Sequence, residues 1–121
     1  MVDTIYSPSA GDTWEILQTF NISWEALYFS EGASLRIELW SNGSPDKIAD
    51  ITTNVSANQE SYLWTIPYYI PTGSNYSVLI GQADGDVLSQ GWGSPSDALV
   101  SSLLFNIEGC KFNLIKKREV E

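Results

Sequence analysis

Aromatic residues expected in loops or on outward faces are the side chains here best suited to binding chemistry. A flat ring can stack on the apolar face of a sugar while nearby carboxylates and amides fix the hydroxyls. Tyr68 and Tyr69 lie in one expected loop, Trp92 in another, and Trp40 on an outward strand face. We take these four as candidate ligand-binding residues, although the two loops need not lie at the same end of the fold. The alternative is that the rings cover the core or contact a partner.

Asparagine side chains offer a second kind of chemistry. Asn-x-Ser, the acceptor sequence for N-glycosylation, occurs at Asn21, Asn42, Asn54 and Asn75. Chance pairing of the seven Asn with the Ser and Thr residues would give fewer such sites, so the excess favours a secreted glycoprotein. The alternative is that Asn and Ser simply gather in turns and on outward strand faces.

Metal, nucleophilic and acid–base chemistry are poorly supported. Without His and with the single cysteine Cys110, the sequence excludes an ordinary zinc site, a Ser-His-Asp triad and an intrachain disulfide. Asp84-Gly85-Asp86 with Asp97 resembles a calcium cluster, but a plain turn is the commoner meaning of that pattern. Paired carboxylates can hydrolyse glycosides, yet the acids here fall mainly in loops or on outward faces. We therefore expect neither an enzyme nor a cofactor or metal.

Composition bounds the class of protein and its partners. The 121 residues are 43% hydrophobic and 12% aromatic, which is typical of one globular domain. A formal net charge of −9 disfavours nucleic acid as a partner. No apolar run is long enough for direct membrane insertion. Because the chain starts without a signal-peptide pattern, we expect either an intracellular protein or one whose signal has been removed.

Alternating hydrophobicity predicts the elements that would hold these side chains. In the segment 62–67, Tyr62, Trp64 and Ile66 share one face, and Pro67 ends the pairing. Similar patterns predict about seven short strands, within residues 3–6 and 13–15 (one edge), 17–24, 34–40, 47–55, 62–67, 76–80 and 99–107. We find no convincing helical period. The sequence therefore predicts an all-β fold, an immunoglobulin- or fibronectin type III-like antiparallel β-sandwich.

Side-chain directions follow from the same alternation. Arg36, Glu38 and Trp40 should point outward, and Leu103 should join Phe105 and Ile107 on one side of the last strand. The apolar residues change from even to odd positions between Ile48 and Ile51, which suggests a β-bulge. Tyr76, at the start of its strand, can form the tyrosine corner of such folds. We expect the sandwich domain to span residues 1–108, and residues 109–121 to be a basic tail or linker.

Several short segments, in order, resemble a known family. They are Tyr6-Ser7-Pro8-Ser9-Ala10-Gly11 with Trp14, Asn21-Ile22-Ser23-Trp24, Leu35-Arg36-Ile37-Glu38-Leu39, Tyr62-Leu63-Trp64-Thr65-Ile66-Pro67, Asn75-Tyr76-Ser77-Val78 and Ser102-Leu103-Leu104-Phe105-Asn106-Ile107. Each motif alone is weak, but their order and spacing across residues 5–107 are fairly specific. The chain resembles the Kre/Knh-type N-terminal domain, also described as the Ser/Thr-rich GPI-anchored membrane family and linked to yeast cell-wall synthesis.

The resemblance implies a secreted or cell-surface module without catalytic residues. Its expected role is binding or assembly of cell-wall polysaccharide, specifically β-glucan. The alternative is a structural or adhesive module that contacts other surface proteins, with an oligomeric state that the sequence leaves open. The family's signal peptide, Ser/Thr-rich stalk and anchor signal have no counterpart in this sequence, so the resemblance leaves membrane anchoring open.

Overall fold

The computed structural model describes residues 5–42, 47–82 and 100–109. Within them the chain forms only strands and two short 3₁₀ turns, η1 (Ala26–Tyr28) and η2 (Ala57–Gln59). The strands are β1 (Ile5–Ser7), β2 (Thr13–Glu15), β3 (Thr19–Trp24), β4 (Ser34–Ser41), β5 (Ala49–Ser56), β6 (Ser61–Thr65), β7 (Gly73–Gln82), β8 (Val100–Ser101) and β9 (Phe105–Glu108). No helix in these ranges is long and apolar enough to cross a membrane.

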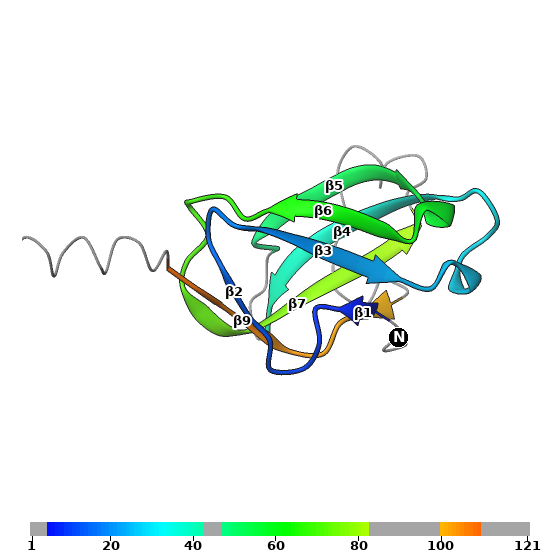
Figure 1. Ribbon diagram of the computed structural model, residues 1–121. Helices are drawn as coiled ribbons and strands as arrows, with labels where there is room; N and C mark the ends of the chain where they lie inside the picture. The colour runs from blue at the N-terminus through cyan, green and yellow to red at the C-terminus, as the bar shows by residue number, and fades with distance from the viewer. Residues whose placement is uncertain (1–4, 43–46, 83–99, 110–121) are drawn as a thin grey trace, which may run out of the picture.

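The strands form two sheets packed face to face (Figure 1). One sheet has the order β1-β3-β6, and the other has the order β2-β9-β7-β4-β5, with β8 also paired to β7. All pairings are antiparallel except that of β2 with β9. The expected sandwich of the immunoglobulin and fibronectin type is confirmed.

The N-terminal segment contributes a strand to each sheet, so the expectation that its two short strands form one edge is wrong. β1 pairs with β3, and β2 pairs with β9 in the opposite sheet. The turn between them holds a cis Ser7–Pro8 peptide bond and Gly11 at φ +78°, a backbone angle that glycine adopts without strain. The Gly11 N–H donates to the Leu104 carbonyl at 3.0 Å, which fixes the turn to the last part of the chain.

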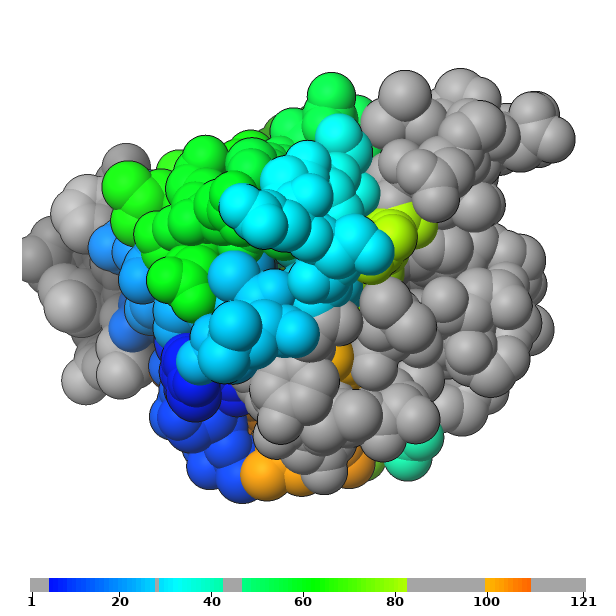
Figure 2. Space-filling view, turned by 90° about the vertical axis from the view of Figure 1, so that its right-hand side faces the viewer, coloured from blue at the N-terminus to red at the C-terminus, as the bar shows by residue number. Residues whose placement is uncertain are grey.

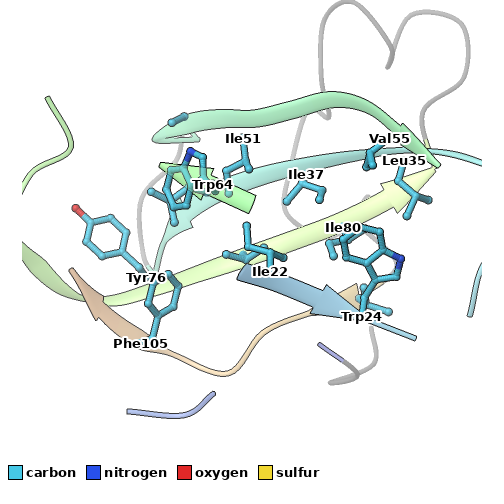
Figure 3. Close-up of a cluster of buried hydrophobic side chains, with 14 of the residues drawn as sticks. Ile22, Trp24, Leu35, Ile37, Ile51, Val55, Trp64, Tyr76, Ile80 and Phe105 are labelled. Atoms are coloured by element: carbon cyan, nitrogen blue, oxygen red, sulfur yellow. The ribbon is translucent and has the colours of Figure 1, made fainter. Parts of the chain in front are cut away.

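The core is a layer of inward-facing side chains from both sheets (Figure 3). Ile22, Trp24 and Trp64 come from the smaller sheet, and they meet Ile37 and Ile80 from the larger one. The buried indole N–H of Trp24 donates to the Ala57 carbonyl at 3.0 Å, so this ring is buried without an unpaired donor. Alternation in the sequence placed Trp64 and Ile66 on one face, and both are buried.

Rings also close the layer near β2. Trp14 stacks on Phe20 with ring centroids 4.7 Å apart and planes 3° from parallel, and it meets Phe105 at 5.1 Å. Tyr76 is buried, and its hydroxyl donates to the Pro71 carbonyl at 2.5 Å. This is the tyrosine-corner contact expected from the sequence, because it ties the start of β7 to the loop before it.

The last strand differs from expectation. Residues 100–107 form parts of two strands, because the Ser102 N–H donates to the Val78 carbonyl at 2.8 Å while the next two residues leave the ladder before β9 begins. Leu103 is consequently half exposed, and its expected place beside Phe105 and Ile107 is wrong. The expected irregularity in the return strand is present, since the β4–β5 register shifts near Thr52.

Replacement of Trp64 by alanine tests the core. Trp64 is 6% exposed, so the cavity and lost burial should lower the free energy of unfolding by about 3–5 kcal/mol. Its neighbour Leu63 is 68% exposed on the opposite face and provides a matched control, for which Leu63→Ala should change stability by less than about 0.5 kcal/mol. Urea denaturation of unglycosylated protein measures both, and equal losses would contradict the assignment of faces.

Candidate functional site

The candidate site is the connection between β6 and β7, residues 66–72, which we call the tyrosine loop. It lies at the end of the sandwich where β2 passes into β3 and where β9 ends (Figure 1). At its start, Ile66 donates to the Gln18 carbonyl at 3.0 Å and accepts from the Leu17 N–H at 2.7 Å. At its far side, the Pro71 carbonyl accepts the Tyr76 hydroxyl. Both ends of the loop are therefore held by the fold.

A turn and a buried anchor shape the loop tip. The Ile70 N–H donates to the Pro67 carbonyl at 3.3 Å, and the Ile70 side chain is buried in the core. The two residues between them have nowhere to bury their rings. Tyr68 is 76% exposed and Tyr69 62% exposed, with centroids 5.8 Å apart and planes at 84°. The loop thus presents two perpendicular aromatic faces to solvent.

Other side chains at this end add apolar and acidic character. Leu17 is half exposed and adopts a left-handed backbone angle, φ +70°, which is rare for a leucine. Glu15 and Glu108 are paired residues at the ends of β2 and β9. The sequence pattern placed Leu17 at the start of the predicted strand 17–24, whereas β3 begins at Thr19 and Leu17 precedes it. Only the hydrogen bond to Ile66 places it beside the tyrosine loop.

The opposite end of the sandwich carries a surface hollow of about 290 Å³. It is lined by residues of the β3–β4 connection and by Asn58 of η2, segments that lie together in Figure 2. Leu27, on its rim, is 87% exposed. The lining includes Glu31 and the ring of Phe29, which is only 8% exposed.

Trp40 does not contribute to an exposed site. It points away from the core, as expected, but it is only 3% exposed. Its indole N–H donates to the Glu38 carboxylate at 2.8 Å. Arg36 and Glu38, expected to point outward on the same face, are also buried, and the expectation that Trp40 is exposed for ligand binding is wrong. Alternation reports the side of a sheet that a residue faces, and that side is covered here.

These buried charges form one network with β5. The Arg36 Nε donates to Glu38 at 2.6 Å, and its other nitrogen contacts Asp50, the residue of β5 that pairs with Glu38. Lys47 lies 2.8 Å from Asp50 and 3.8 Å from Glu38. Arg36 and Lys47 are the two basic residues of the sequence before Gly109, and both form ion pairs in this network. This geometry is that of a structural polar network.

Some of the remaining candidates from the sequence lie outside the described residues, and the others lie within them. Outside the described residues lie Trp92, Cys110 and the acidic residues Asp84, Asp86 and Asp97, for which the sequence favours a plain turn over a calcium cluster. Among the described residues, no group of three His, Cys, Asp or Glu is arranged to hold a metal. The four sequon asparagines are all described, and all are exposed: Asn21, Asn42, Asn54 and Asn75.

Substitutions in the buried network should be strongly non-additive. Glu38→Leu leaves the buried Arg36 without one partner and should lower the unfolding free energy by roughly 3 kcal/mol. The double variant Arg36→Met/Glu38→Leu removes both buried charges and should recover much of that loss. Chemical denaturation of Arg36→Met, Glu38→Leu and the double variant gives the coupling free energy between the two side chains. A double variant as unstable as the sum of the single variants would contradict the network.

Asp50 should make stability depend on acid pH. Burial raises its pKa, but the hydrogen bond from Lys47 and the charges of Arg36 and Lys47 outweigh burial, so the pKa lies below the ordinary 3.8. The folded state therefore favours the carboxylate. Its contribution is complete above the ordinary pKa and is lost as pH falls through the lower folded value.

Thermal unfolding between about pH 5 and pH 2 checks this dependence. Asp50→Asn should show a smaller loss of Tm with falling pH than the parent. An unchanged slope in Asp50→Asn would show that its carboxylate has the same pKa folded and unfolded.

Comparison with known proteins assigns the fold to a family. A search of curated proteins gave no match. Residues 7–91, more than half of the chain, match the Kre9/KNH-like N-terminal Ig-like domain, and the matched range contains the tyrosine loop and Tyr76. The family is tied to fungal cell-wall β-glucan synthesis, suggests a cell-wall or secreted context, and is not a known catalytic family. With its two-sheet fold and its tyrosine corner, this chain belongs to the Kre9/KNH-like family of N-terminal Ig-like domains.

Proposed function

We propose that this domain is a non-enzymatic module of the cell wall or cell surface that binds β-glucan through the tyrosine loop. The observation that carries the proposal is the exposed, perpendicular pair Tyr68 and Tyr69. Exposed rings at a loop tip leave apolar surface in water unless a ligand covers it, and the faces of a pyranose ring suit that surface. The family context supplies the class of polysaccharide.

The surroundings of the loop fit a neutral polymer. The body of the domain is acidic, and the two basic residues before Gly109 are held in the network on the larger sheet. An anionic polysaccharide would be repelled, whereas an uncharged glucan would not. The rings stand at the tip of a loop, so a long chain can pass across them. Binding of this kind holds a glucan strand in place without changing it, which is the contribution expected of an assembly module.

Substitution of the rings tests the proposal. Tyr68→Ala and Tyr69→Ala should each weaken binding of soluble β-1,3- or β-1,6-glucan oligosaccharides by roughly tenfold, because each removes a stacking face. Tyr6→Ala is the matched control: Tyr6 is exposed on β1, which pairs with the opposite end of β3 from the tyrosine loop. Calorimetry measures the affinities, and circular dichroism confirms that each variant is folded.

Two outcomes would contradict the proposal. If the parent domain binds no β-glucan, the glucan-binding role is wrong. If it binds and both loop variants bind equally well, the site lies elsewhere. A parent that ignores glucan but self-associates in sedimentation, with association lost in the loop variants, would instead support the structural or adhesive role.

A further inference from the structure

The outer face of the smaller sheet has one feature that the proposed function does not use. Along β3 and β6 this face carries small hydroxyl side chains, namely Thr19, Ser23, Ser61 and Thr65. The hydroxyls of Thr19 and Thr65 lie 2.6 Å apart. Leu63 stands among them with 68% of its surface exposed. An isolated exposed leucine needs no explanation by itself, but its cross-strand neighbour gives this one a context.

That neighbour is Asn21, the first residue of an Asn-Ile-Ser sequon. The Trp24 N–H donates to the Glu60 carbonyl, so the hydrogen-bonded pairs of this ladder include Trp24 with Glu60. Alternation along an antiparallel ladder makes Asn21 and Leu63 a non-hydrogen-bonded pair. In such pairs the Cα atoms are about 4.5 Å apart and the side chains are close together.

We propose that Asn21 carries an N-linked oligosaccharide whose first sugar residue packs on Leu63. The donor is a lipid-pyrophosphate-linked oligosaccharide of the secretory pathway. The Asn21 carboxamide nitrogen forms a bond to the sugar C1 and loses a proton, while the bond from C1 to the pyrophosphate oxygen breaks and the lipid pyrophosphate leaves. The inference uses the secreted context of the family and does not depend on glucan binding.

The surface around Asn21 can accommodate this sugar. Asn21 is exposed, and its neighbours on the same face are small hydroxyl residues, which leave room and offer hydrogen-bond partners. The apolar face of the sugar would cover the leucine that is otherwise in water. It would also shield β6, an edge strand of this sheet, from pairing with another chain.

The other sequons lack this pairing. The Asn42 N–H donates to the Asn75 carbonyl at 2.8 Å, so glycans on these two residues would compete for the same space. Asn75 also has a left-handed backbone, φ +67°. Asn54 is exposed on β5, and the residues it neighbours in sequence, Thr53 and Val55, include no exposed large apolar side chain. Asn54 therefore serves as the comparison site.

Secretion of the full 121-residue chain from a yeast host, followed by peptide mapping, tests occupancy. The peptide containing Asn21 should be glycosylated in most molecules. Ser23→Ala should remove that glycan alone, and Asn54→Gln should leave it in place. An unmodified Asn21 in the secreted, folded parent would overturn the proposal. If in that case Leu63→Ala alters self-association, the leucine faces a protein partner instead.

Trimming tests the contact with Leu63. Endoglycosidase H leaves one N-acetylglucosamine on each occupied asparagine. The trimmed parent should melt higher than trimmed Asn21→Gln by on the order of 3 °C. Ser23→Ala provides the same comparison without changing Asn21. In a Leu63→Ala background the difference should disappear, and a difference that persists there would show that the sugar does not act through the leucine.

Discussion

The apolar layer between the two sheets is the constraint on which the rest of the structure depends. The smaller sheet has three strands, and its large residues Trp24 and Trp64 fill the thin layer by meeting aliphatic residues of the larger sheet. This packing also fixes connections outside the layer. The Trp24 indole holds η2 through Ala57, and the buried Ile70 holds the tyrosine loop. The loop that carries the candidate site is thus placed by the same burial that stabilises the fold.

A second buried region, on the outer face of the larger sheet, uses charge in place of apolar surface. Arg36 and Glu38 are almost fully buried, and they meet Asp50 and Lys47 from β5 and the connection before it. Buried ion pairs contribute little net stability unless the buried groups also form their hydrogen bonds. The Glu38 carboxylate accepts such a bond from the Trp40 indole N–H. The network occupies the basic residues of the body and leaves its surface acidic, which restricts the ligands that the domain attracts.

The two proposals concern separate surfaces. The tyrosine loop lies at one end of the sandwich, whereas Asn21 and Leu63 lie on the outer face of the smaller sheet, within the ladder. A glycan on that face would cover an edge strand while the loop tip stays accessible. Such a division suits a module of a polymer-rich surface, because protection from unwanted pairing and recognition of a ligand then use different side chains.

The sequence by itself determined the fold class, the shared face of Trp64 and Ile66, the tyrosine corner of Tyr76 and the family, because each depends on local alternation or on a short motif. The tertiary structure decided which outward residues meet solvent. Trp40 is covered and Leu103 is exposed, against expectation, while Leu17 reaches the candidate site through one backbone hydrogen bond. A period of two specifies the face of a strand, but whether that face is covered depends on segments distant in sequence. For the same reason the pairing of Asn21 with Leu63 follows from register, which only the assembled sheet fixes.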